Sequence, residues 1–345
     1  MTEPKERLNL KNLSLTELES FVVSLGEKPF RAGQLAAWLY GKEIRSFAEM
    51  TSLAKSFREK LASSAQISFL QADQIQSAKD GTKKYRFILK DGERIESVLI
   101  PEKDHFTLCL STQVGCALHC QFCLTGKRGF VRNLDPSEII DQILGVRATL
   151  PAGAKLTHLV LMGQGEPLMN PVNVLRALEI IRSPQGLQFS NRRVTLSTAG
   201  IIPRVEELAS RKHFVKLAVS LNASTDEQRS TLMPVNRKYP LKDLLAACRK
   251  IPLSNRERIT FEYVLLQGVN DSLEDARRLA HLLKGLQAKV NLIPFNEYPG
   301  APFRRPAEEK IQQFQEVLRD HRLTAIVRQS KGADIQAACG QLWGK

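Results

Sequence analysis

Four of the six cysteines in this chain of 345 residues lie close together, at Cys109, Cys116, Cys120 and Cys123. The last three have the spacing C-x3-C-x2-C. Three thiolates on one short loop can hold three corners of an iron–sulfur cubane, which leaves one iron free to bind an exogenous chelating ligand. The spacing therefore predicts a [4Fe-4S] cluster with an open coordination position.

Three other interpretations of this loop remain. Zinc could bind the same three thiolates with Cys109 as a fourth ligand. Cys120 and Cys123 could form a redox-active C-x2-C pair, or the cysteines could be structural. The spacing, the aromatic Phe122 before the last cysteine and the position after the first strand of a βα series favour the cluster.

A glycine-rich stretch, Gly163–Pro167, follows a predicted strand. Glycine lets a ligand approach the backbone closely, and Glu166 can pair with a cation or accept a hydrogen bond from an amine. Such loops are also common as structural turns, so the stretch alone fits either interpretation.

The net charge of +14 comes from 50 Lys and Arg against 36 Asp and Glu. This excess favours a polyanionic partner, most often nucleic acid, although a solvated basic surface is the alternative. Met1–Asp73 holds 10 basic and 9 acidic residues, so the excess belongs to the rest of the chain. Candidate phosphate contacts are Lys127, Arg128, Arg192, Arg193, Arg211, Lys212, Arg304 and Arg305.

The composition, 43% hydrophobic and 25% charged, is that of a globular protein. No apolar run approaches the roughly 18 residues that span a bilayer, and the charged segment Met1–Leu10 lacks the apolar core of a signal peptide. We therefore expect a cytoplasmic protein without membrane association. In that reducing compartment the cysteines are not expected to form a disulfide framework.

The chain before residue 74 predicts three or four short helices. Ser14 and Glu17 form a capping box ahead of one amphipathic run that opens at Leu15. Phe30–Tyr40 and Phe47–Leu61 supply two further helical patterns. A hairpin follows, because Lys84–Leu89 and Arg94–Ile100 are joined through Asp91-Gly92, whose two residues can both adopt positive φ.

From Phe106 onward, strands and helices alternate. The predicted strands are Thr107–Ser111, Thr157–Met162, Arg193–Ser197, Val215–Leu221, Ile259–Leu266, Lys289–Ile293 and Ala325–Arg328. The predicted helices are Ser137–Ala148, Asn173–Arg182, Pro203–Ala209, Leu241–Cys248, Leu273–Leu283 and Ala307–Asp320. Six βα units indicate parallel strands with right-handed crossovers, as a sheet or partial barrel. The chemistry of such folds lies after the carboxyl ends of the strands.

These motifs together resemble the RlmN/Cfr family of radical S-adenosylmethionine (SAM) enzymes. Further matching segments are Gln113–Cys116, Gly129–Leu134, Met162–Pro167, Val194–Thr198, Ser220–Ala223, Ile293–Asn296 and Asp334–Leu342. The resemblance covers nearly the whole chain. It implies an α/β fold: a partial (β/α)6 barrel at 106–345, behind an N-terminal helical RNA-binding domain at 1–73 and a β-hairpin extension at 74–105.

The resemblance also implies an activity, the methylation of adenine C2 at adenosine 2503 of 23S rRNA and at adenosine 37 of tRNAs. Two SAM molecules are used per turnover. One methylates the sulfur of Cys339, and the second is cleaved to a radical that takes hydrogen from that methyl group. The methyl carbon then adds to C2, and Cys109 attacks the Cys339 sulfur to form a transient disulfide. Glu96 matches the proton acceptor, whereas Cys248 has no expected role.

By the same resemblance, SAM is bound by Gly165, Glu166, Ser197, Ser220, Leu221, Asn222 and Asn296, and the cluster by Cys116, Cys120 and Cys123. Several relatives have histidine where Asn222 stands, which puts the detail of that contact in question. The expected partners are 23S rRNA, tRNA and an electron donor such as flavodoxin or ferredoxin. The expected state is a monomer.

Three alternative functions remain. A C8-methylating enzyme like Cfr would carry the same cysteines, although the long N-terminal module and the run Gly129–Leu134 favour C2. A glycyl-radical activase would not need Cys339. A zinc-stabilised RNA-binding protein would hold one zinc ion and no iron.

Overall fold

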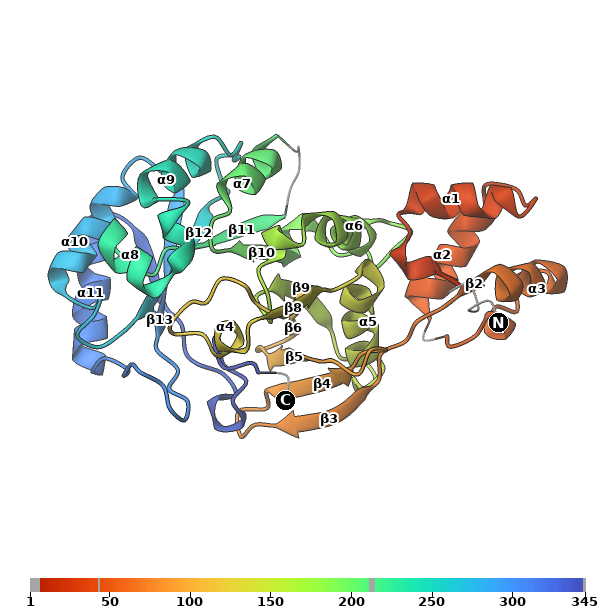
Figure 1. The fold of residues 1–345 in the computed structure, drawn as a ribbon, viewed down its shortest axis with the longest axis horizontal. Coiled ribbons are helices and arrows are strands. Elements are labelled where there is room, and N and C mark those ends of the chain that lie inside the picture. The colour runs from red at the N-terminus through yellow and green to blue at the C-terminus, as the bar shows by residue number, and fades with distance from the viewer. Residues whose placement is uncertain (1–6, 43, 211–214, 344–345) are drawn as a thin grey trace.

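The computed structural model describes residues 7–42, 44–210 and 215–343, and one ten-stranded sheet runs through most of them (Figure 1). Its strand order is β14-β13-β12-β11-β10-β9-β6-β5-β4-β3. The bounds are β3 Ala72–Ser77, β4 Lys83–Ile88, β5 Arg94–Pro101, β6 Phe106–Cys109, β9 Leu156–Leu161, β10 Val194–Thr198, β11 Lys216–Ser220, β12 Ile259–Leu265, β13 Ala288–Pro294 and β14 Thr324–Val327.

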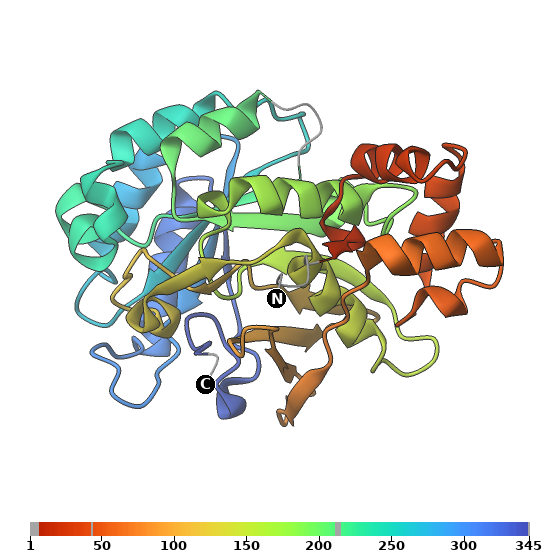
Figure 2. The same cartoon turned by 45° about the vertical axis from the view of Figure 1, so that its right-hand side comes forward.

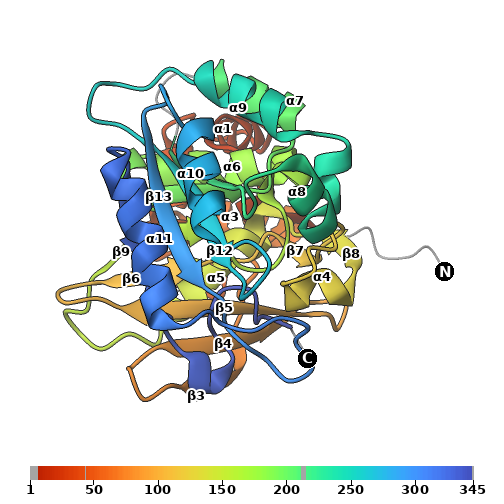
Figure 3. The same cartoon turned by 90° about the vertical axis from the view of Figure 1, so that its left-hand side faces the viewer.

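The strands from β6 and β9 to β14 are all parallel, and a helix follows each of the first six. These helices are α5 Pro136–Arg147, α6 Pro171–Arg182, α7 Ile202–Ala209, α9 Leu241–Arg249, α10 Leu273–Leu282 and α11 Glu308–Asp320. In Figure 3, α10 and α11 lie beside β13. The predicted βα series is therefore confirmed. Two short helices, α4 Leu124–Arg128 and α8 Asp226–Leu232, were not predicted because neither spans enough turns to show a helical period.

The sheet is open, since β14 and β3 lie at its two edges. A partial barrel is therefore confirmed. After β14, residues 328–343 cross to the opposite edge; we call this segment the strap (Figure 2). There the Gly332 amide donates to Asp80 Oδ2 (3.0 Å), and the Trp343 amide donates to Glu96 Oε2 (2.8 Å). The strap thus connects the two edges that the strands leave unpaired.

The predicted hairpin is the antiparallel pair β4–β5. Its turn differs from the expected one, because only Gly92 has a positive φ (+84°) while Asp91 does not. Hydrogen bonds from the Leu89 amide to the Glu93 carbonyl and from the Gly92 amide to the Leu89 carbonyl close a longer loop. β3 adds a third antiparallel strand, and the predicted domain boundary at 73/74 falls inside it.

The N-terminal residues form α1 Leu15–Ser24, α2 Arg31–Gly41 and α3 Lys55–Ser64, at the end of the molecule remote from α10 and α11 (Figure 1). The capping box of Ser14 and Glu17 is confirmed. The pattern Phe47–Leu61 is not one helix. Ser46 and Glu49 cap a single 3-10 turn, Phe47–Glu49, and α3 begins only at Lys55. Two small ladders complete the fold, β1 Leu8–Asn9 with β2 Ala65–Gln66 and β7 Gln113–Gly115 with β8 Phe130–Asn133. Among the described helices, none combines the length and apolar composition that a bilayer crossing needs.

A buried ion pair fixes the N-terminal helices to the barrel. Lys11 Nζ lies 2.6 Å from Asp141 Oδ1 on α5, and the two side chains are 1% and 0% exposed. Lys11 also donates to the Ser68 carbonyl (2.7 Å), and the Ser68 hydroxyl donates to Asp141. Burial raises the pKa of Asp141, and Lys11 opposes that rise. Each charge therefore depends on its partner.

Replacement of Asp141 with alanine should leave the Lys11 ammonium buried without a counter-charge. We expect the free energy of unfolding of the N-terminal helices to fall by about 3–5 kcal/mol. Trp38 in α2 reports this transition in urea when Trp343 is replaced by phenylalanine. The matched control K11M/D141L removes both charges and should recover most of the loss. A loss below about 1 kcal/mol in D141A would contradict a buried, mutually dependent pair.

Candidate active site

A cavity opens at the carboxyl ends of the parallel strands; we call it the site pocket. It is lined by the loop that carries Cys116, Cys120 and Cys123, which we call the cysteine loop, and by the glycine-rich loop. The ends of β10 to β13 and the strap complete the lining. Ten of the thirteen predicted site residues line it: Cys116, Cys120, Cys123, Gly165, Glu166, Ser197, Ser220, Asn222, Asn296 and Cys339. Glu96, Cys109 and Leu221 do not. The fold thus gathers residues from the whole βα series, as expected for this end of the strands.

The cysteine loop is closed tightly between β7 and β8. The Cys116 amide donates to the Gly129 carbonyl (2.9 Å), and the Cys123 amide donates to the Cys120 carbonyl (3.1 Å). Gly115 precedes the loop with φ +72°, and a Cβ there would lie 1.8 Å from the Gly129 oxygen. Only glycine fits at that position, and its absence of a side chain lets the two ends of the loop meet.

The three thiols of the loop interact with one another. Burial raises the pKa of Cys116 to about 12. Burial also raises the pKa of Cys120, and the charges of Cys123 and Cys116 raise it further. Thiols must lose their protons to bind metal, and the positive charge of bound iron offsets the burial and mutual repulsion that disfavour the three thiolates. In the described ranges, no three His, Cys, Asp or Glu side chains already form a single-ion site. The donor set of three soft thiols nonetheless fits an iron–sulfur cluster.

The zinc alternative required Cys109 as a fourth ligand. Cys109 is buried in β6, packs with Ala337 and Leu342, and does not line the site pocket. The structure therefore does not bring this fourth ligand to the cysteine loop.

Glu166 is fixed by the backbone of two neighbouring segments. Its Oε1 accepts from the Leu168 amide (3.0 Å), and its Oε2 accepts from the Ala199 amide (2.7 Å). Burial raises the pKa of Glu166, and these hydrogen bonds oppose the rise. The carboxylate is therefore held rigidly at the pocket wall, and an ionised carboxylate has lone pairs left after two such bonds.

Asn222 follows β11 in the left-handed region, with φ +58°, which asparagine tolerates better than most residues. Its Oδ1 accepts from the Val264 amide (2.9 Å), and its Nδ2 donates to Met233 Sδ (3.2 Å). Both ends of the amide are therefore used inside the protein. Asn222 lines the pocket, but its side-chain contacts hold the turn.

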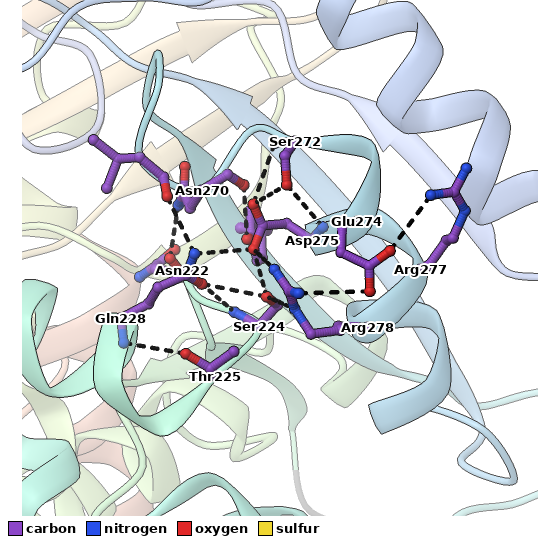
Figure 4. Close-up of polar contacts among 12 residues, drawn as sticks. Asn222, Ser224, Thr225, Gln228, Asn270, Ser272, Glu274, Asp275, Arg277 and Arg278 are labelled. Atoms are coloured by element: carbon purple, nitrogen blue, oxygen red, sulfur yellow. Dashed lines mark hydrogen bonds and ion pairs between the residues drawn. The ribbon is translucent and has the colours of Figure 1, made fainter.

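The turn after β11 is tied to the start of α10 by a polar network (Figure 4). The Asn270 side chain donates to the Asn222 carbonyl (2.8 Å). Asp275 accepts from Ser224 (2.6 Å), Gln228 (2.9 Å) and Arg278 (2.7 Å). This network braces the loop that leads from the pocket into α8.

The strap places Cys339 at the pocket. The Asn296 side chain donates to the Cys339 carbonyl (3.1 Å), and the Leu124 amide donates to the Gly340 carbonyl (2.7 Å). The Thr125 hydroxyl donates to the Leu342 carbonyl (2.7 Å). Cys339 is exposed toward the cavity, yet the protein around that cavity desolvates the thiol and raises its pKa to about 11.

Cys109 lies within electrostatic reach of Cys339. Burial raises the pKa of the Cys109 thiol, and Cys339 raises it further. Ala337 and Leu342 of the strap pack against Cys109. The two thiols predicted to form a transient disulfide thus lie on adjoining elements, Cys109 on β6 and Cys339 on the strap that packs against it.

Glu96 lies elsewhere. Its Oε2 accepts from the Trp343 amide (2.8 Å), its Oε1 lies 3.3 Å from Lys84 Nζ, and it lines a second hollow with Gln336 and Gln341. The structure does not bring Glu96 into the site pocket. Leu221 is fully buried, so only its backbone could contact a ligand.

Sequence reasoning missed two residues of the site. Glu262 on β12 lines the pocket and accepts from the Ser197 hydroxyl (3.3 Å), and burial raises its pKa. One acid inside the apolar strand Ile259–Leu265 was the available signal. Arg229 of α8 is fully buried. It was missed because its helix, Asp226–Leu232, is mostly polar, and such a sequence predicts a surface helix.

Three of the eight predicted phosphate contacts are paired with acids. Arg128 pairs with Glu93 (2.5 Å), Arg304 with Glu297 (2.9 Å) and Arg305 with Glu308 (3.3 Å). Lys127 lies over the Tyr298 ring, 5.1 Å from its centre. Arg192 and Arg193 are exposed, and Arg211 and Lys212 lie outside the described residues.

The raised pKa of Cys339 predicts a steep pH dependence of its alkylation. The thiolate is the reactive form, so the rate with iodoacetamide should rise about tenfold per pH unit from about pH 7 to about pH 10. Peptide mass spectrometry measures it at Cys339, with Cys248, buried in α9, as the unreactive control. A plateau below about pH 9 would contradict the desolvated thiol.

Comparisons with known proteins agree along the chain. Residues 8–67 match the family model "Ribosomal RNA large subunit methyltransferase N-terminal domain", and residues 110–280 match "Radical SAM superfamily". The chain is 50% identical over 340 residues to "Dual-specificity RNA methyltransferase RlmN" of Geotalea uraniireducens (99% of this chain, 98% of the relative). It is 54% identical over 340 residues to the protein of the same name from Syntrophotalea carbinolica (98% and 90%).

A solved structure matches the fold over the same extent. The radical SAM methyltransferase from Sphaerobacter thermophilus superposes with a TM-score of 0.92 at 43% identity, covering 98% of this chain and 100% of the other.

Proposed function

This chain belongs to the RlmN family of radical SAM enzymes, and we propose that it methylates adenine C2 in both 23S rRNA and tRNA. The positions inferred from the resemblance are adenosine 2503 of 23S rRNA and adenosine 37 of tRNA. One observation carries the proposal: Cys339 is held in the same pocket as the three thiols of the cysteine loop.

Cys116, Cys120 and Cys123 would hold the [4Fe-4S] cluster. The predicted SAM residues would bind the cosubstrate, Glu166 through its fixed carboxylate and Ser197 and Ser220 through hydroxyls at the ends of their strands. When bound there, cluster and SAM supply the methyl group and the radical-forming cleavage. The apolar wall from Leu118, Phe122 and Phe295 excludes water from this chemistry.

Cys339 would carry the methyl group to the base, since adenine C2 is not nucleophilic. Cys109 would then attack the Cys339 sulfur, so that an S–S bond forms as the S–C bond to the product breaks. The packing of Cys109 against the strap on both sides of Cys339 supports this pairing. Glu96 would accept the C2 proton. Because it now accepts the Trp343 amide in a second hollow, this role requires the strap to move.

The remaining expectations extend the proposal. The enzyme would act in the cytoplasm as a monomer and receive electrons from flavodoxin or ferredoxin.

Nucleoside mass spectrometry tests the function. The anaerobically reconstituted protein should form 2-methyladenosine in unmodified 23S rRNA and tRNA transcripts, and a deletion strain should lack it in 23S rRNA. Formation of 8-methyladenosine instead would favour the Cfr-like alternative. A colourless preparation with one zinc and no iron would favour the RNA-binding alternative.

A further inference from the structure

Three cations gather on the sheet face that also carries the site pocket. Side chains two residues apart on a strand share a face, so Lys216 lies on the face of Ser220, and Lys289 lies on the face of Ile293. Arg328 directly follows β14, and its amide donates to the Leu292 carbonyl (2.8 Å), so strand pairing continues to this residue. Arg328 is two residues after Ile326 and therefore lies on the same face as Ile326. Ser220 and Ile293 both line the pocket.

The strand register brings these cations together. Lys216 on β11 and Lys289 on β13 are separated by β12, where Thr260 pairs with both Ala218 and Lys289. Lys289 pairs with Thr324 of β14. Burial lowers the pKa of Lys289, and the neighbouring charges of Lys216 and Arg328 lower it further. We call Lys216, Lys289 and Arg328 the concave cation cluster.

No ion pair among the described residues neutralises this cluster. Within the described residues, none of the three side chains makes an ion pair or a hydrogen bond, in contrast to Arg128, Arg304 and Arg305. Lys216 and Arg328 are exposed, and Ile326 between Thr324 and Arg328 is 41% exposed, so solvent reaches this face. Three unpaired cations repel one another, and a bound polyanion would remove that repulsion.

One member of the cluster, Arg328, connects it with the site pocket. Arg328 interacts electrostatically with both Glu262 and Cys339 of the site pocket. Lys216 and Lys289 lie four residues before Ser220 and Ile293 on the same face, so the cluster extends from Arg328 toward the amino ends of β11 and β13.

We propose that Lys216, Lys289 and Arg328 bind the phosphates of the RNA that flank the target adenosine. This inference rests on the proposed function and names the part of the protein that holds its substrate. It also explains why sequence reasoning overlooked the residues: they come from three strands and are adjacent only in the folded sheet.

The double variant K216Q/K289Q tests the inference in the full-length reconstituted enzyme. Its dissociation constant for an unmodified tRNA transcript should rise about tenfold or more, and the slope of log affinity against log salt should flatten by about one to two. SAM cleavage without RNA should be unchanged. The matched control K242Q/K284Q removes two exposed, unpaired lysines from the helical side of the fold and should bind RNA like the wild type.

Removal of mutually repelling charges should not destabilise the protein, and the single variant R328Q serves as a second test if the double variant loses iron. Affinity and slope equal to those of the control pair would overturn the inference. The inference would also be overturned if the variants bound RNA like the wild type but were no longer stabilised by inorganic phosphate. The same holds if they bound RNA normally but were no longer reduced by flavodoxin. If wild-type protein forms no methyladenosine, the proposed function fails, whatever the variants bind.

Discussion

Cys339→Ala should abolish formation of 2-methyladenosine, by roughly a thousandfold or more, as expected when a group that forms the covalent intermediate is removed. The thiol is the only nucleophile that the strap presents to the pocket, and the neighbouring Ala337 and Ala338 cannot replace it. Iron content and reductive cleavage of SAM should stay near wild type, because Cys339 lies on the strap and not on the cysteine loop.

Cys248→Ala is the matched control. Cys248 is buried in α9, away from the pocket, so this variant should keep its methylation activity. Nucleoside mass spectrometry measures both variants. Full activity of the Cys339 variant would remove the central step of the proposed function and favour an activase.

Arg229→Met should prevent the pocket from forming. The Arg229 guanidinium is fully buried and donates to five acceptors: the carbonyls of Ala199 (2.6 Å), Ser220 (3.1 Å), Leu221 (3.1 Å) and Tyr239 (3.3 Å), and Asn236 Oδ1 (2.9 Å). Each buried acceptor left without a donor costs about 1–3 kcal/mol. The sum reaches the whole stability of a typical domain, about 5–15 kcal/mol.

The damage should be centred on the SAM residues. Arg229 joins the ends of β10 and β11, and the amide of Ala199 holds Glu166. Its helix also supports the cysteine loop, because the Gln121 amide donates to the Leu232 carbonyl (2.9 Å). Thermal unfolding and SAM binding measure the effect.

Two further variants separate charge from hydrogen bonding. Arg229→Lys keeps the charge but has fewer donors, so it should be intermediate. Arg278→Met removes an arginine from the network of Figure 4 at a half-exposed position and should be mild. A midpoint of unfolding for Arg229→Met within about 2 °C of wild type would contradict the role assigned to Arg229.

The elements that sequence reasoning predicted correctly are those with local signals. The strands of the βα series are apolar runs, and the Ser14–Glu17 cap and the cysteine loop depend only on neighbours in the chain. The spacing of Cys116, Cys120 and Cys123 was therefore enough to predict a cluster, and the fold brings the three into one pocket. The roles of Cys109 and Cys339 came only from the family resemblance.

Local sequence signals could not predict contacts between residues that are distant in the chain. The Leu124 amide meets the Gly340 carbonyl only because the sheet is open and the strap crosses it. The family resemblance assigned Glu96 to the chemistry, yet its carboxylate accepts the Trp343 amide of the strap and lies outside the site pocket. The concave cation cluster likewise exists only in the register of β11 to β14.

The strap couples the closure of the open sheet to the position of Cys339. The segment that spans the gap between the sheet edges also carries Cys339, the thiol proposed to receive the methyl group. Any displacement that frees the strap from Leu124, Thr125 and Asn296 withdraws Cys339 from the cysteine loop at the same moment. The contacts that hold the strap across the sheet are therefore the same contacts that position the thiol, so a substitution that loosens one should displace the other.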